Sequence, residues 1–253
     1  MASFESGGVS LAYDDIGRPD RPCVILVHGF ATNRGENWRR LGWYGAFERK
    51  GFRCVALDCR GHGESAKPHE PALYASAAMT GDIFALMDHL QIARADVMGY
   101  SMGARLALSA ALARPERIAN LVLGGVGAKL FDPPLAGHPM ADAMATDSAE
   151  AISEPVLKSF RHFADEQGGD RGALSACARG LDFHFTRDML GAVRVPTLVV
   201  AGARDALAGD PGELAAAIPG ARAVTLPGCD HFSAIPHGLF KASVIDFLEG
   251  VLE

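Results

Sequence analysis

The sequence has no long apolar run, no basic tract and few cysteines. No apolar stretch approaches the ~18 residues that a membrane-spanning helix needs, so we expect no membrane span. Its 24 Lys and Arg residues and 30 Asp and Glu residues give a net charge of −6 and are spread along the chain. Because proteins that bind nucleic acid or anionic membranes usually carry a basic stripe, neither kind of partner is expected.

The five cysteines are odd in number, and no two of them form a Cys-x-x-Cys pair. Reduced thiols are therefore expected, as in a cytoplasmic protein. No close group of Cys and His residues has the spacing of zinc ligands, so the sequence predicts no metal and no other cofactor. The N-terminal segment lacks the cationic start and apolar core of a signal peptide, which also favours the cytoplasm.

The chain of 253 residues is 49% apolar and 21% charged, which suits one large core rather than a disordered chain. Short apolar runs alternate with helical patterns, and this predicts a doubly wound, mostly parallel α/β sheet with helices on both faces. The Gly7-Gly8 pair predicts a hairpin turn between two strands. The expected strands cover residues 3–6, 9–15, 23–27, 53–57, 95–100, 118–123, 195–201 and 221–226, and helices are expected at 102–113 and 239–252.

One stretch interrupts this alternation. Residues 128–190 contain no convincing strand but several prolines. Four apolar residues between Val156 and Phe163 follow the spacing of one helix face. We therefore expect a helical cap at 128–190, inserted into a core domain formed by 1–127 and 191–253.

The segment Gly99-Tyr100-Ser101-Met102-Gly103 fits the pattern G-x-S-x-G and lies between an expected strand and an expected helix. A serine at such a sharp turn projects its hydroxyl from the sheet edge, and side chains two residues away would clash there. Ligands of open α/β sheets bind beyond the carboxyl ends of the strands. Ser101 is therefore a candidate nucleophile.

A serine nucleophile needs a base, and the base needs an acid that orients it. His231 follows the last expected strand and Asp205 follows the strand before it, so both lie just past strand ends, as Ser101 does. The oxyanion of acyl transfer needs hydrogen-bond donors. The backbone N–H groups of Phe30, after the His28-Gly29 turn, and of Met102 are the candidates.

These residues resemble the α/β-hydrolase superfamily over nearly the whole chain. The resemblance rests on His28-Gly29-Phe30, the segments 58–65 and 99–103, the run from Val195 to Asp205, and the segment 228–231. It implies a sheet of about eight strands with a helical cap over the active site. It also implies Ser101 as nucleophile, His231 as base and Asp205 as its partner, with Phe30 and Met102 as oxyanion donors.

Three further features near these residues bear on the choice of the catalytic acid and on the role of the charged loop. Some relatives carry the acid after the preceding strand, but that strand ends here in Gly124-Gly125-Val126, which favours Asp205. We expect Asp230 to point away from its neighbour His231. In the resembling family the segment 58–65 is a structural loop, and its charges are expected to pair locally.

The candidate substrate-binding residues are mostly aromatic. They are Tyr100 and, in the expected cap, Phe160, Phe163, Phe183 and Met144. Apolar walls of this kind favour an acyl or aryl group over a charged one. The sequence thus predicts a carboxylesterase-like serine hydrolase that acts on a small or medium apolar ester through an acyl-enzyme intermediate.

Two other functions stay open. A serine at position 101 argues against the dehalogenase and epoxide-hydrolase branches, whose resemblance would require aspartate there. Carbon–carbon bond hydrolases usually have Asn where this chain has Tyr100, which weakens that alternative without removing it. A non-catalytic small-molecule receptor can share the fold, and the sequence also leaves a homo-oligomer open.

Overall fold

A computed structural model describes residues 2–133 and 137–251. In these residues the strands form one eight-stranded sheet in the order β1-β2-β4-β3-β5-β6-β7-β8. Strand β2 runs antiparallel to β1 and β4, and the other neighbours are parallel. The strands are β1 (Ala2–Ser6), β2 (Val9–Ile16), β3 (Cys23–Val27), β4 (Arg53–Leu57), β5 (Ala95–Tyr100), β6 (Ile118–Gly124), β7 (Thr197–Gly202) and β8 (Arg222–Leu226). The predicted mostly parallel sheet is confirmed.

Two predicted boundaries were wrong by more than one residue, each for a local reason. Strand β7 begins at Thr197 and not at residue 195, because Pro196 has no N–H to contribute to a sheet. The last helix, α9 (Gly238–Leu248), ends four residues before the predicted residue 252. Gly250 follows it with a φ of +71°, a left-handed conformation that ends helices.

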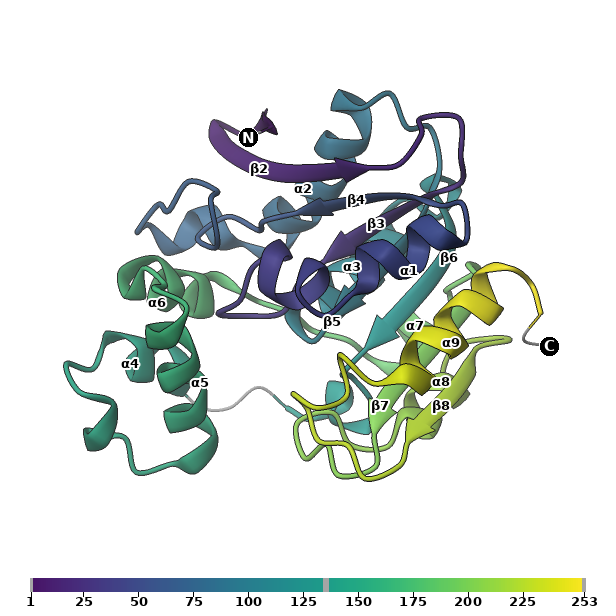
Figure 1. Ribbon diagram of the computed structural model, residues 1–253. Coiled ribbons are helices and arrows are strands. Elements are labelled where there is room, and N and C mark those ends of the chain that lie inside the picture. The colour runs from purple at the N-terminus through teal and green to yellow at the C-terminus, as the bar shows by residue number, and fades with distance from the viewer. Residues whose placement is uncertain (1, 134–136, 252–253) are drawn as a thin grey trace.

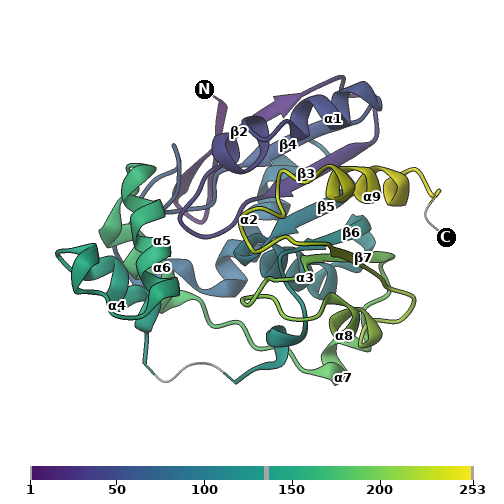
Figure 2. The same ribbon diagram turned by 60° about the horizontal axis from the view of Figure 1, so that its bottom comes forward.

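Helices cover both faces of the sheet (Figures 1 and 2). Helices α1 (Trp43–Arg49) and α9 lie on one face. Helices α2 (Ser76–His89), α3 (Met102–Ala113) and α8 (Pro211–Ala216) lie on the other. The shorter helical turns are η1 (Gly35–Arg39), η2 (Pro71–Tyr74), η3 (Pro115–Arg117), η4 (Ala128–Phe131), η5 (Ala149–Ala151) and α7 (Arg187–Leu190).

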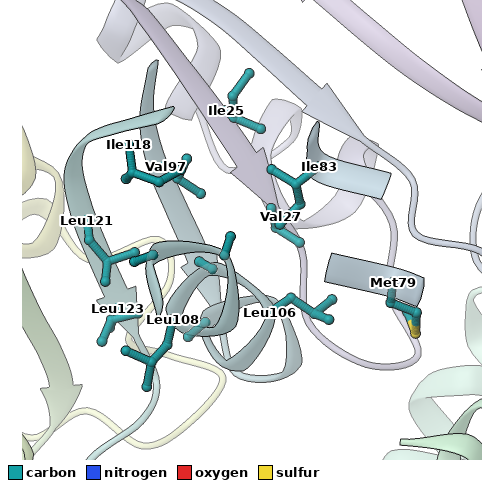
Figure 3. Close-up of a cluster of buried hydrophobic side chains, with 14 of the residues drawn as sticks. Ile25, Val27, Met79, Ile83, Val97, Leu106, Leu108, Ile118, Leu121 and Leu123 are labelled. Carbon is teal, nitrogen blue, oxygen red and sulfur yellow. The ribbon is translucent and has the colours of Figure 1, made fainter. Parts of the chain in front are cut away.

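Strand β3 shows why the sheet needs cover on both sides. All five of its residues are buried, and successive side chains point to opposite faces. Val24 packs with the α1 and α9 side, whereas Ile25 and Val27 pack with the α2 and α3 side. Figure 3 shows Ile25 and Val27 beside Ile83 of α2 and Leu106 of α3. Each such fully buried side chain stabilises the fold by about 1.5–3 kcal/mol.

Helices α4 (Pro139–Ala145), α5 (Pro155–Glu166) and α6 (Arg171–Gly180) gather at one end of the molecule (Figures 1 and 2). They share a small core that contains Met144, Phe160 and Leu174. No strand lies in the described part of 128–190. Leu130 and Leu190, which flank these helices, pack instead in the main core. The division of the chain into a core domain and a cap stays a prediction.

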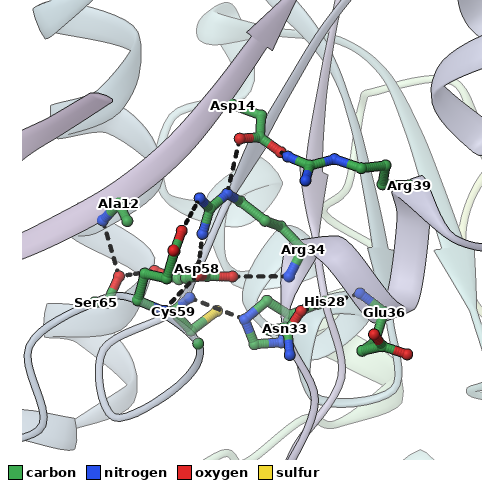
Figure 4. Close-up of polar contacts among 12 residues, drawn as sticks. Ala12, Asp14, His28, Asn33, Arg34, Glu36, Arg39, Asp58, Cys59 and Ser65 are labelled. Atoms are coloured by element: carbon green, nitrogen blue, oxygen red, sulfur yellow. Dashed lines mark hydrogen bonds and ion pairs between the residues drawn. The ribbon is translucent and has the colours of Figure 1, made fainter. Parts of the chain in front are cut away.

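Buried ion pairs fix the loop that follows β4 (Figure 4). The Arg34 guanidinium contacts the carboxylates of Asp14, Asp58 and Glu64. Asp58 also accepts hydrogen bonds from the backbone N–H groups of Arg34 (2.7 Å) and Glu64 (2.8 Å). Deeper in the core, Arg60 binds Asp82 through two hydrogen bonds of 2.8 and 2.5 Å. The loop charges therefore do pair with neighbours in space, and these partners are distant in sequence.

The Arg60–Asp82 pair gives a stability prediction. Substitution Asp82→Ala leaves the Arg60 guanidinium buried without its carboxylate, which costs about 3–5 kcal/mol of unfolding free energy. Urea unfolding followed by circular dichroism measures this cost. The matched control is Asp20→Ala, which breaks the exposed Arg18–Asp20 pair and costs less than about 1 kcal/mol. Equal losses in the two variants would contradict the prediction.

Candidate active site

Ser101 stands on a sharp turn between the end of β5 and the start of α3. Its backbone has φ +55° and ψ −110°, a conformation that non-glycine residues rarely adopt. A Cβ at Gly99 would lie 2.1 Å from the Gly103 carbonyl oxygen, and a Cβ at Gly103 would lie 2.0 Å from the Val27 oxygen. Both glycines of the motif are therefore required by backbone contact, as the sequence pattern predicted.

The three predicted catalytic side chains form one hydrogen-bonded chain. His231 Nε2 lies 3.0 Å from Ser101 Oγ, and His231 Nδ1 lies 2.8 Å from Asp205 Oδ2. His231 and Asp205 are both buried. The second carboxylate oxygen, Asp205 Oδ1, accepts hydrogen bonds from the N–H groups of Leu207 (3.0 Å) and Ala208 (2.9 Å). These bonds hold the carboxylate in the orientation that meets the imidazole.

Backbone contact also brings the Asp205 and His231 loops together. A Cβ at Gly202, the last residue of β7, would lie 2.2 Å from the Cys229 carbonyl oxygen. The same oxygen accepts a hydrogen bond of 2.8 Å from the Arg204 N–H. Asp230 points elsewhere, because its carboxylate accepts from the N–H groups of Phe232 and Ser233. Asp205, and not Asp230, is therefore the carboxylate beside the imidazole.

The two predicted oxyanion donors belong to segments that adjoin Ser101. Met102 is the first residue of α3, so its N–H has no acceptor within the helix. Across the pocket, a Cβ at Gly29 would lie 3.6 Å from Ser101 Cβ, which places the Gly29-Phe30 turn against the serine. The Asn37 side chain supports this turn by accepting from the Gly29 N–H at 3.3 Å.

Ser101 opens on a cavity of about 310 Å³. One wall comes from the segment 29–41, one from α5, and one from the loop that carries His231. Apolar side chains dominate the walls, and Arg40 and Glu36 form an ion pair of 2.8 Å between them. The lining residues are Gly29, Phe30, Thr32, Glu36, Asn37, Arg40, Leu41, Tyr100, Ser101, Phe160, Phe163, Gln167, His231, Phe232 and Ile235.

Three of the five predicted substrate-binding residues line this cavity, namely Tyr100, Phe160 and Phe163. Met144 does not, because it is fully buried among the helices α4–α6. Phe183 lines a separate cavity beside α2 and α3, where its ring stacks on Phe185 at 5.9 Å. It lies there because the chain after α6 is tied to the start of α2, where Asp182 and Ser76 exchange two hydrogen bonds.

Several lining residues were not predicted from the sequence. Asn37 lies on the π-helical turn η1, for which the sequence gives no periodic signal. Phe232 follows His231 directly, and its ring packs at 5.7 Å from Phe160 and at 5.9 Å from Phe163. Its place next to the predicted base was a usable signal.

Comparison with known proteins agrees with this geometry. The family model for the alpha/beta hydrolase fold matches residues 22–149. The chain belongs to the α/β-hydrolase family. It is 30% identical to 3-oxoadipate enol-lactonase 2 of Acinetobacter baylyi, covering 78% of this chain and 76% of that protein. It is 32% identical to the dihydrolipoyllysine-residue acetyltransferase component of the acetoin cleaving system of Pseudomonas putida, over 90% of this chain. The chain spans only 63% of that protein's length.

A solved structure of the same family superposes closely. The enol-lactonase of Burkholderia xenovorans matches with a TM-score of 0.82 at 28% identity, over 98% of this chain and all of that one. These relatives of the α/β-hydrolase family indicate a hydrolase. In the described part of the chain, no helix is both long and apolar enough to cross a membrane.

Two buried histidines support the wall of this hydrolase site without touching Ser101. His28 accepts from the Cys59 N–H at Nε2 (3.0 Å), so its Nδ1 carries the proton and donates to the Gly29 oxygen (2.6 Å). The His62 ring packs edge-on against Phe30 at 5.6 Å. Burial lowers the pKa of His28 to about 4 and that of His62 to about 3. Both imidazoles are therefore neutral at neutral pH.

This burial predicts a pH-dependent stability. As pH falls from about 6.5, the unfolded chain protonates His62 while the folded chain does not, so the free energy of unfolding decreases. At pH 5 the loss from this one group is about 2 kcal/mol relative to pH 7. In His62→Phe this component is absent, so the variant loses less stability between pH 7 and pH 5.

Urea unfolding at pH 7 and at pH 5 measures how much unfolding free energy each protein loses between the two pH values. The control is His184→Phe, which removes an exposed histidine. It should lose as much stability between pH 7 and pH 5 as the wild type. Equal losses in wild type and His62→Phe would show that His62 does not titrate as described.

Proposed function

We propose that the protein is a serine hydrolase that cleaves small or medium carboxylic esters through an acyl-enzyme intermediate. The observation that carries this proposal is the hydrogen-bonded chain of Ser101, His231 and Asp205 at the edge of a mostly apolar cavity. The enol-lactonase relatives support an ester substrate, because a lactone is a cyclic ester.

In the acylation step, Ser101 Oγ attacks the ester carbonyl carbon while its proton moves to His231 Nε2. The carbonyl oxygen becomes an oxyanion that accepts from the N–H groups of Phe30 and Met102. Asp205 stabilises the imidazolium and keeps Nδ1 protonated. The carbon–oxygen bond then breaks, and the His231 proton passes to the leaving alkoxide.

In the deacylation step, water takes the place of the alcohol. His231 Nε2 accepts a proton from the water as its oxygen attacks the acyl carbon. The bond to Ser101 Oγ breaks and the serine regains its proton from His231. The products are one carboxylic acid and one alcohol, and the enzyme returns to its starting state.

The cavity walls favour an uncharged substrate. Among its described lining residues, the one Arg or Lys is Arg40, and Glu36 already neutralises its charge. Three aromatic rings, those of Phe160, Phe163 and Phe232, supply apolar surface on the other side. A carboxylate on the substrate would therefore meet no uncompensated cation, which favours simple apolar esters over anionic ones.

We also infer a cytoplasmic location and a cap role for the helices α4–α6. All five cysteines are free and buried, as suits a reducing compartment. Helix α5 contributes Phe160, Phe163 and the adjoining Gln167 to the cavity, so these helices cover the proposed site.

The mechanism predicts that Ser101→Ala lowers kcat for ester hydrolysis by at least about 10³-fold, because the nucleophile is lost. Hydrolysis of p-nitrophenyl esters, from acetate to long acyl chains, measures the loss and the preferred acyl length. Ser109→Ala is the control, since Ser109 lies on α3 beside the second cavity. Full activity in Ser101→Ala would refute the mechanism.

The absence of ester hydrolysis would change the functional assignment. If neither wild type nor Ser101→Ala hydrolyses any ester, a carbon–carbon bond hydrolase or a ligand receptor replaces the esterase. Tight binding of a small apolar molecule without turnover would then favour the receptor.

The Arg40–Glu36 pair predicts a specificity change. Glu36→Gln frees the Arg40 charge, so KM for an anionic ester such as p-nitrophenyl hemisuccinate falls about fivefold, whereas KM for the neutral butyrate ester stays the same. The size is modest because the Arg40 side chain is exposed. The control Glu249→Gln frees Lys50 on a distant surface and changes neither KM. An unchanged KM ratio in Glu36→Gln would mean that Arg40 does not face the substrate.

A further inference from the structure

Tyr100 precedes the proposed nucleophile in the chain and is hydrogen-bonded to the backbone of the proposed base. Its hydroxyl donates a hydrogen bond of 2.5 Å to the backbone carbonyl oxygen of His231, which lies 131 residues later in the chain. The two rings pack at 5.4 Å. Because this hydroxyl donates to the protein backbone, we assign it to the structure of the site and not to the substrate.

Close neighbours restrict the position of the Tyr100 ring. A Cβ at Gly124 would lie 2.8 Å from the ring, and a Cβ at Gly125 would lie 2.7 Å from it. The ring also packs against Phe240 of α9 at 6.3 Å. The side chain is only 2% exposed, and burial holds its pKa well above the usual value, so the hydroxyl stays a donor.

The Tyr100–His231 hydrogen bond links the segments that carry the proposed nucleophile and the proposed base. Ser101 is attached to Tyr100 by one peptide bond, so the same strand end carries the nucleophile and the group that holds the base. Ser101 is itself fixed by its N–H, which donates to the Gly124 oxygen at 2.8 Å. A shift of the His231 backbone would change the 3.0 Å contact between Nε2 and Oγ directly.

We propose that Tyr100 is a positioning residue that sets the His231 backbone, and through it the imidazole, against Ser101. The inference deepens the proposed hydrolase function and rests on it. Removing only the hydroxyl, in Tyr100→Phe, keeps the ring and its neighbours but leaves the His231 carbonyl without this donor. Since displacements of about 1 Å cost up to 10²-fold in rate, we expect about a tenfold loss.

The test measures the rate constant at which a fluorophosphonate probe labels Ser101, since this reaction needs the base but no particular substrate. Tyr74→Phe is the matched control. Tyr74 is also fully buried and donates to a backbone carbonyl, that of Pro68, at 2.6 Å, but it does not line the Ser101 cavity. We expect about tenfold slower labelling in Tyr100→Phe at full amplitude, and wild-type labelling in Tyr74→Phe.

Several outcomes separate positioning from a merely structural role. Irreversible unfolding lowers the labelled fraction and leaves the rate constant unchanged, whereas a displaced base lowers the rate constant at full amplitude. Reversible unfolding would have to reach about nine tenths of the molecules to slow labelling tenfold, and circular dichroism detects unfolding of that extent. Ester kinetics should show the loss in kcat with KM unchanged. In a His231→Ala background, Tyr100→Phe should cause no further loss.

Failure of this inference is distinguishable from failure of the proposed function. Labelling of Tyr100→Phe at the wild-type rate would overturn the positioning role even if the esterase activity is present. Normal wild-type labelling without any ester hydrolysis would overturn the esterase function and leave the positioning role standing. A wild type that the probe does not label would overturn both.

Discussion

The site depends on backbone segments that approach too closely for side chains to fit between them. Gly103 rests on the end of β3, and Gly202 rests on the loop that carries His231. Gly124 and Gly125 leave room for the Tyr100 ring in the same way. Because these contacts join the ends of neighbouring strands, the proposed nucleophile, acid and base are fixed relative to one another by the sheet. A methyl group at Gly103 or Gly202 would require these backbone segments to move apart, and one at Gly124 or Gly125 would displace the Tyr100 ring.

Charge plays a different part in the same region. The carboxylate of Asp58 is fully buried, and it is held by Arg34 and by two backbone N–H groups. Gly63 passes so close that a Cβ there would lie 2.1 Å from Asp58 Oδ2. This network does not touch Ser101. It fixes the loop that carries His62, whose ring supports Phe30 at the wall of the cavity. The loop is structural, as its family resemblance implied.

The sequence predicted the sheet and the hydrogen-bonded Ser101, Asp205 and His231 because each depends on local signals. Buried parallel strands are short apolar runs, and the three polar residues follow the ends of such runs. The lining residues of the cavity depend on tertiary packing instead. Phe160 belongs to the helical pattern between Val156 and Phe163, whereas Phe183 lies outside any helix. Neither position shows which cavity the ring lines, because that depends on the path of the chain between them.

The difference between the hydrogen-bonded site and its apolar walls also bears on substrate assignment. The family model ends at residue 149, so it includes Ser101 but neither α5 nor the loops of Asp205 and His231. Those loops are tied to the proposed site by the 2.8 and 3.0 Å hydrogen bonds of His231. Helix α5 meets the site through packing contacts, among them those of the Phe160 ring with Phe30, His231 and Phe232. Because these contacts form the cavity wall, the aromatic cavity of this chain is better information about the proposed substrate than the names of its relatives.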